Sequence, residues 1–125
     1  MRWLAAMLNL DTHILIRALA GELTARETEI LSGDQWGISA IVLWEIATLS
    51  QLGRIEIDID SAEFARAVSA LHVWPLDLTV SRTTRHLDFR SDPADEIIAA
   101  TSITHKAPLV TRDRRIRSSK LVPLA

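Results

Sequence analysis

The sequence contains no cysteine, which excludes disulfides and thiolate metal sites and agrees with a reducing compartment such as the cytoplasm. Its four glycines are isolated from one another, so it has neither a P-loop nor a Gly-x-Gly-x-x-Gly motif, and we expect no nucleotide cofactor. A Gly-x-Ser-x-Gly motif, typical of serine hydrolases, is missing as well. No apolar run approaches the roughly 20 residues that a membrane-spanning helix needs, so we expect no membrane association.

Acidic and basic side chains are nearly balanced in number but unevenly distributed. Residues 1–63 have 4 basic and 10 acidic side chains, whereas residues 64–125 have 10 basic and 6 acidic ones. The densest basic cluster consists of Arg112, Arg114, Arg115, Arg117 and Lys120. Two interpretations of this cluster remain open: it binds an anionic partner, or it is the solvated surface of a helix.

The 125 residues correspond to a single domain, residues 1–125, in which strand-like and helix-like patterns alternate. Strands are predicted at residues 3–10, 36–38, 73–76 and 108–111, and residues 121–124 are a candidate closing strand. Helices are predicted at residues 12–20, 24–31, 61–71, 79–86 and 92–105, in a segment around Glu45 that Gly53 ends, and briefly after Asp113. This alternation predicts an α/β fold, a three-layer α/β/α sandwich with a central, mostly parallel sheet of four to five strands.

Two aspartates directly follow predicted strands. Asp11 comes after the first strand, and Asp113 comes shortly after the strand at residues 108–111. Parallel strands present their carboxyl ends at one edge of the sheet, where sites in such folds gather, so we expect both side chains at that edge. Aspartate is also a preferred N-cap, and each of the two equally fits the start of a helix.

Glu45 interrupts an apolar segment. On a helix its side chain points in the same direction as Ile41, Val42, Leu49 and Leu52, which places a carboxylate on the buried face. Burial of an unpaired charge costs several kcal/mol. The carboxylate is therefore protonated, paired with a cation such as Arg112, or bound to a metal ion.

The segment that begins with Asp92 and Pro93 opens a helix, with Asp95 and Glu96 in its first turn. A helix needs only one cap, and Asp95 in the first turn faces the sheet edge. If Asp95 converges with Asp11, Glu45 and Asp113, the four carboxylates repel one another, and a divalent ion relieves this repulsion. An all-oxygen site selects Mg²⁺ or Mn²⁺, whereas the four histidines have no spacing typical of zinc ligands.

Four motifs, in this order, resemble PIN-domain ribonucleases and in particular the VapC-type toxins of bacterial toxin–antitoxin pairs. The motifs are residues 8–13, residues 38–47 with Glu45, residues 92–95 and residues 109–113. The resemblance implies catalytic roles for Asp11, Glu45, Asp95 and Asp113, with Asp92 as a fifth metal ligand and Thr12 and Thr111 as hydroxyl supports. It further implies Mg²⁺ or Mn²⁺, an RNA substrate, a homodimer and a cognate antitoxin. The sequence departs from the family pattern at two places. Glu96 stands where such toxins often have arginine, and Arg90-Ser91 replaces a common His-Arg.

These considerations lead to the hypothesis of an endoribonuclease that cleaves RNA with metal-activated water, with Arg112, Arg114, Arg115 and Arg117 on the RNA backbone. One alternative is a catalytically inactive module that binds RNA or protein on the same fold, and another is a structure-specific DNA nuclease. Five apolar residues of the first two helices fit either core packing, which we favour, or a contact with a second subunit or an antitoxin: Ile14, Leu15, Leu19, Ile30 and Leu31.

Overall fold

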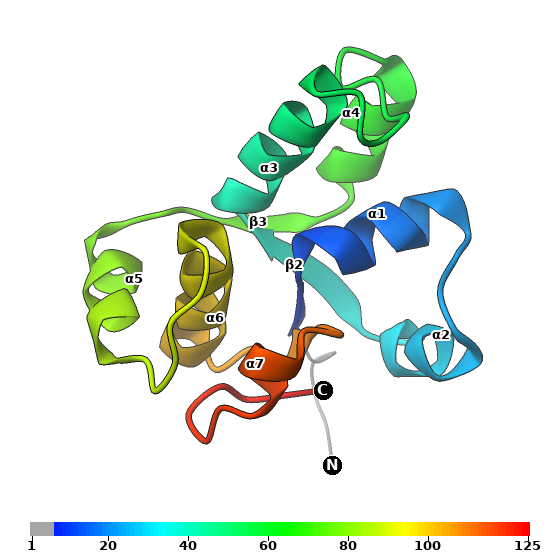
Figure 1. The fold of residues 1–125 in the computed structure, drawn as a ribbon. Coiled ribbons are helices and arrows are strands. Elements are labelled where there is room, and N and C mark those ends of the chain that lie inside the picture. The colour runs from blue at the N-terminus through cyan, green and yellow to red at the C-terminus, as the bar shows by residue number, and fades with distance from the viewer. Residues whose placement is uncertain (1–6) are drawn as a thin grey trace.

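The computed structural model describes residues 7–125, so the first four positions of the strand predicted at residues 3–10 lie outside the described part of the chain. Figure 1 shows the order of the elements along the chain. The strands are β1 (Met7–Leu10), β2 (Gln35–Ser39), β3 (His72–Trp74) and β4 (Leu109–Val110). The helices are α1 (Thr12–Ala20), α2 (Ala25–Leu31), α3 (Ala40–Gln51), α4 (Ala62–Ser69), α5 (Leu78–Thr83), the 3₁₀ helix η1 (Thr84–His86), α6 (Pro93–His105) and α7 (Arg114–Arg117).

The four strands form one parallel sheet in the order β3-β2-β1-β4. This arrangement confirms the predicted α/β class with a central parallel sheet. The candidate closing strand at residues 121–124 is reduced to a single parallel bridge between Leu109 and Leu124. Because β1 lies between β2 and β4, the residues that follow β1 and β4 emerge side by side at the carboxyl edge of the sheet.

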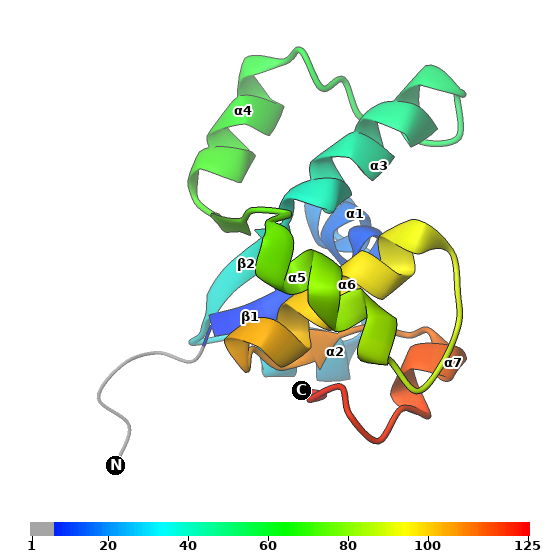
Figure 2. The ribbon, with the colours of Figure 1, turned by 90° about the vertical axis from the view of Figure 1, so that its left-hand side faces the viewer.

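Helices cover both faces of the sheet. Figure 1 shows α5 and α6 on one side and α1 and α2 on the other, and the view turned by 90° in Figure 2 places α5 and α6 in front of the strands. The hairpin of α3 and α4 projects beyond the sheet (Figure 1). Within residues 7–125, no helix has the length and apolar character needed to cross a bilayer.

The core lies between the sheet and these helices. Ile14, Leu15 and Leu31 are buried in it, as core packing predicts, whereas Leu19 is exposed. The other fully buried large side chains include Leu10, Ile38, Val42, Ile46, Val80, Ile98, Leu109 and Ile116. Helix α3 contributes only Val42 and Ile46 to the fully buried set, and Leu52, expected on the buried face with Glu45, is 62% exposed because the helix ends before it.

Gly37 of β2 allows the indole of Trp74 on the neighbouring strand β3 to pack against the sheet. A β-carbon at position 37 would lie 2.6 Å from the Trp74 ring, far closer than two carbon atoms can approach. The same indole stacks on the His105 ring at a centroid distance of 5.5 Å, so Trp74 is held between the sheet and the end of α6.

Capping side chains explain most of the helix boundaries. Asp11 and Ser61 accept hydrogen bonds from the backbone N–H groups of Ile14 and Phe64, and a left-handed Gly53 with φ of 72° follows two residues after the end of α3. Asp92 differs from the expectation, because its side chain makes no capping hydrogen bond although α6 begins directly after it. Pro93 at the first helical position is the remaining start signal, since its ring already has a helical φ.

Candidate metal centre

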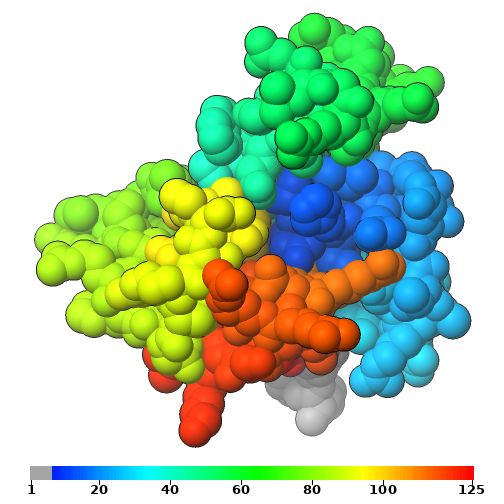
Figure 3. Space-filling view, viewed as in Figure 1, coloured from blue at the N-terminus to red at the C-terminus, as the bar shows by residue number. Residues whose placement is uncertain are grey.

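A cleft of about 410 Å³ lies at the carboxyl edge of the sheet. Its lining residues are Asp11, Thr12, His13, Ile14, Arg17, Glu45, Asp92, Asp95, Arg112 and Asp113. All four predicted catalytic acids, together with Asp92, therefore face one cavity although they come from four separate segments of the chain. In Figure 3 the surfaces of these segments, coloured blue (start of α1), teal (α3), yellow (start of α6) and orange (after β4), meet near the centre of the face shown.

Asp11 is the most deeply buried of these acids, with 8% of its surface exposed. Its Oδ1 accepts the hydrogen bond of the Ile14 N–H at 2.8 Å, and its Oδ2 accepts one from the Thr111 hydroxyl. Burial raises the pKa of Asp11, which the hydrogen bonds from Thr111 and Ile14 partly offset. The N-cap and the site interpretations are thus compatible, since one oxygen caps α1 and the other faces β4.

Glu45 is half-buried in α3, and the Thr12 hydroxyl donates a hydrogen bond to its Oε1. Burial, then the negative charges of Asp95 and Asp11, raise the pKa of Glu45. The alternative of an ion pair between Glu45 and Arg112 is wrong, because Arg112 binds Glu27 through two contacts of 2.6 Å. Nothing in the local sequence distinguishes these two glutamates as partners of Arg112, since both lie far from it along the chain.

Asp95 lies in the first turn of α6, where its Oδ2 accepts a hydrogen bond from the Ser91 hydroxyl at 3.0 Å. Burial raises the pKa of Asp95, and the charges of Asp113 and Asp92 raise it further. Ser91 was not predicted as a site residue, because in the sequence it stands out only as a departure from the family pattern. Its position four residues before an acidic side chain was the available signal for a supporting hydroxyl.

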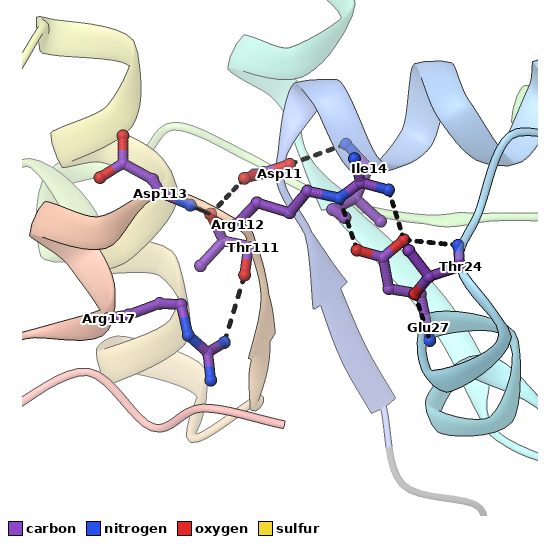
Figure 4. Close-up of polar contacts among 8 residues, drawn as sticks. All are labelled: Asp11, Ile14, Thr24, Glu27, Thr111, Arg112, Asp113 and Arg117. Carbon is purple, nitrogen blue, oxygen red and sulfur yellow. Dashed lines mark hydrogen bonds and ion pairs between the residues drawn. The ribbon is translucent and has the colours of Figure 1, made fainter.

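Asp113 caps α7, since its Oδ1 accepts hydrogen bonds from the N–H groups of Arg115 at 2.9 Å and Ile116 at 3.1 Å. Its own N–H donates to the Thr111 oxygen at 3.0 Å. The hydroxyl of Thr111 therefore connects the two strand-end acids, because it donates to Asp11 and accepts from Asp113 (Figure 4).

The donor set suits a hard divalent cation. Three carboxyl groups in the cleft have raised pKa values, and in each case neighbouring acids contribute to the increase. As the side chains stand within residues 7–125, no three acidic or histidine groups are close enough to bind one ion. Mg²⁺ commonly keeps several water ligands and binds one or two carboxylates directly, so acids that surround a wide cleft fit such an ion.

A histidine and an arginine of α1 also line the cleft and were not predicted from sequence. His13 and Arg17, one helical turn apart, line the same cavity as the acids, and His13 lowers the pKa values of Asp11, Glu45 and Asp95. Neither has a spacing relative to the acids along the chain that identifies it. Both lie on the helix that Asp11 caps, and the packing of α1 against α3 brings Glu45 to the same cavity.

The four arginines predicted to bind RNA are divided among three hollows. Arg112 lines the acidic cleft, whereas Arg114 and Arg115 line a separate hollow with Asp88 and Phe89. Arg117 lies in a third hollow, which Arg112 also reaches, and its guanidinium donates to the carbonyl oxygen of Thr111 at 3.2 Å. Arg112 is therefore the member of this group that borders the carboxylates.

A larger hollow of about 700 Å³ lies between α4 and the β2 side of the molecule. Its lining is mostly apolar and includes Leu15, Leu19, Trp36, Phe64 and Leu71. It contains none of the acids described above, so it is a poor site for phosphodiester chemistry.

Comparison with known proteins agrees with this fold. The family model for the PIN domain matches residues 9–120. "Ribonuclease VapC22" of Mycobacterium tuberculosis (strain ATCC 25618 / H37Rv) is 36% identical over 100 residues, which cover 77% of this chain and 76% of that protein.

Two solved structures have the same fold. A toxin–antitoxin complex from Klebsiella pneumoniae matches with a TM-score of 0.67 at 20% identity, covering 89% of this chain and 90% of that chain. VapBC2 from Rickettsia felis, bound to a DNA fragment from its promoter, matches with a TM-score of 0.66 at 19% identity, covering 95% of this chain and 97% of that chain.

Proposed function

The chain belongs to the PIN-domain family, and on this basis we propose that it is a metal-dependent endoribonuclease and the toxin of a toxin–antitoxin pair. The observation that carries the proposal is the single cleft lined by five carboxylates from four separate segments. The 36% identical relative is named as a ribonuclease, which supports RNA as the substrate. Toxin–antitoxin complexes among the structural neighbours support the role of a toxin.

In this proposal Asp11, Glu45, Asp95 and Asp113 hold Mg²⁺ or Mn²⁺, with Asp92 as a further ligand. A divalent ion at such a site supplies an activated water and stabilises the negative charge that develops on the phosphodiester. The chain itself orients the carboxylates: the hydroxyls of Thr12, Thr111 and Ser91 each donate to one acid. Each of these hydrogen bonds uses one lone pair of its carboxylate, and a carboxylate has further lone pairs that can bind a metal ion.

Arginine side chains bind the RNA backbone in the proposed complex. Arg112 borders the cleft, while Arg114, Arg115 and Arg117 lie on the neighbouring surface and contribute salt-sensitive affinity that is independent of base sequence. A single strand or loop fits the open cleft better than a stacked duplex. We further propose a homodimer and a cognate antitoxin as partners, in line with the toxin–antitoxin complexes of the same fold.

The test is cleavage of mixed RNA by purified protein with Mg²⁺, with Mn²⁺ and with a chelator. We expect fragments only when metal is present. Asp11→Asn and Asp95→Asn should abolish cleavage while the fold remains, because asparagine also caps helices and can accept the Ser91 hydrogen bond. Asp60→Asn is the matched control, since Asp60 is exposed and lies outside the cleft.

Each outcome separates the candidate functions. RNA that binds without being cut would support the inactive binding module and refute the nuclease. Preferential cleavage of a structured DNA competitor would replace the ribonuclease with a DNA nuclease. An Asp95→Asn variant that cleaves RNA as fast as the parent would refute the assigned site.

A further inference from the structure

The side chain of Arg112 crosses the mouth of the acidic cleft and ends on α2. Its backbone lies between Thr111, which binds Asp11, and the acid Asp113. Its guanidinium nevertheless turns away from both acids: Nε donates to Oε2 of Glu27 and Nη2 donates to Oε1, both at 2.6 Å (Figure 4). Such a two-pronged contact fixes the orientation of the guanidinium as well as its position.

Glu27 is itself held in place by its own helix. It is the third residue of α2, and the N–H of Thr24 donates to its Oε1 at 2.9 Å while its N–H donates to the Thr24 oxygen at 3.1 Å. This capping box leaves the Glu27 side chain 13% exposed, compared with 40% for Arg112. The hydrogen bonds from Arg112 lower the pKa of Glu27 to about 2, so the carboxylate stays ionised at neutral pH.

Arg112 lies close enough to the cleft to interact electrostatically with its carboxylates. It lines the same cavity as Asp11 and Asp113, and the negative charge of Asp11 adds to the effect of Glu27 in raising the pKa of Arg112. A guanidinium that is released from Glu27 has these carboxylates as alternative acceptors in the cavity that it lines. An arginine that pairs with a carboxylate of the site competes with a divalent cation for the same oxygens.

We propose that Glu27 is a positioning residue that holds Arg112 across the mouth of the cleft and thereby keeps the guanidinium from neutralising the carboxylates that bind metal. The inference rests on the proposed metal site. It assigns a role to a residue of α2 that none of the family motifs contains and that lies 85 positions from its partner in the sequence. Held in this way, Arg112 still has unused N–H groups that can contact an RNA phosphate.

The test is a double-mutant cycle read out by calorimetric titration of the whole chain with Mn²⁺ in the absence of RNA. Glu27→Gln removes the charge and keeps the capping box, because glutamine serves equally well at that position. We expect it to weaken Mn²⁺ binding about tenfold, a coupling in the usual range for residues of one charged network. Arg112→Gln alone should change the affinity less than about twofold, and the double variant Glu27→Gln/Arg112→Gln should bind like the parent.

Glu29→Gln is the matched control, since it removes the same charge from the exposed side of the same helix and should leave Mn²⁺ binding unchanged. A Glu27→Gln variant that binds Mn²⁺ as tightly as the parent would overturn the inference. Strictly additive effects of the two substitutions would also overturn it, because they would mean that Glu27 acts only through its distant charge. A parent that binds no Mn²⁺ would refute the proposed function together with this inference. A parent that binds Mn²⁺ without cutting RNA would refute the function alone.

Discussion

The hydroxyl of Thr111 is the smallest group on which the geometry of two acids depends, and Thr111→Val removes it with almost no change in shape. In the parent the hydroxyl donates to Asp11 and accepts from the N–H of Asp113 at 3.0 Å. A hydrogen bond to a charged group contributes about 1.5–3 kcal/mol, and one between neutral groups about 0.5–1.5 kcal/mol. We therefore expect Thr111→Val to lower the free energy of unfolding by about 2–4 kcal/mol.

Thr101→Val is the matched control for this measurement. Thr101 and Thr111 are 0% and 5% exposed, so the added methyl group is buried in both variants and its contribution cancels in the comparison. The Thr101 hydroxyl donates only to the carbonyl oxygen of Ile97 in the preceding turn of α6, an acceptor that the helix already uses. We expect the control to cost less than about 1 kcal/mol.

The assay is urea denaturation in chelator at about pH 8 and about pH 4. The Thr111 hydrogen bond lowers the pKa of Asp11 in the folded state, so its loss raises that pKa and destabilises the ionised form. The difference between parent and variant should therefore grow as the pH rises, and should shrink as Asp11 becomes protonated. A Thr111→Val variant that loses no more stability than Thr101→Val at pH 8 would refute the assigned role.

Two further predictions concern the carboxylate cluster and the sheet. Glu45→Gln should raise the melting temperature in chelator at about pH 8, because burial raises the folded-state pKa of Glu45 and the ionised carboxylate destabilises the fold above that pKa. This gain in melting temperature should disappear as the pH falls toward the ordinary pKa of 4.5. A variant that melts at a lower temperature than the parent at pH 8 would contradict the prediction. Gly37→Ala should lower the free energy of unfolding by about 1–3 kcal/mol, since a β-carbon lies 2.6 Å from the Trp74 ring, and Trp74→Leu in the same chain should remove most of this difference.

Much of the fold follows from short-range signals. The first helix has the predicted bounds of residues 12–20 because Asp11 caps its start and Gly21, with φ of 71°, ends it. The parallel sheet follows from the alternation of strands and helices, since consecutive parallel strands require a crossover. The prediction at residues 121–124 was less accurate, because a strand is stabilised by its partner and this segment makes only one bridge to β4.

The acids of the candidate site were also predictable as individuals, because Asp11 and Asp113 follow strands, Glu45 interrupts an apolar helix, and Asp95 lies in the first turn of α6 beyond the residue that precedes the helix. The residues that surround these acids were harder to predict from the sequence. His13, Arg17 and Ser91 lie near acids in the sequence but do not belong to a recognisable ligand pattern, and the partner of Arg112 is on a helix that no local pattern relates to it. Glu45 fits the sequence as a partner of Arg112, whereas the structure pairs Arg112 with Glu27.

The sequence by itself determined the order of strands and helices and which strand or helix ends have acidic side chains, because caps, glycines and hydrophobic periodicity act within a few residues. The tertiary structure alone decided which charges meet. The strand order β3-β2-β1-β4 places β1 beside β4, so that Asp11 and Asp113 share the hydroxyl of Thr111, while α2 brings Glu27 to Arg112. Contacts of this kind join residues up to 100 positions apart, and they exist only once the sheet has formed.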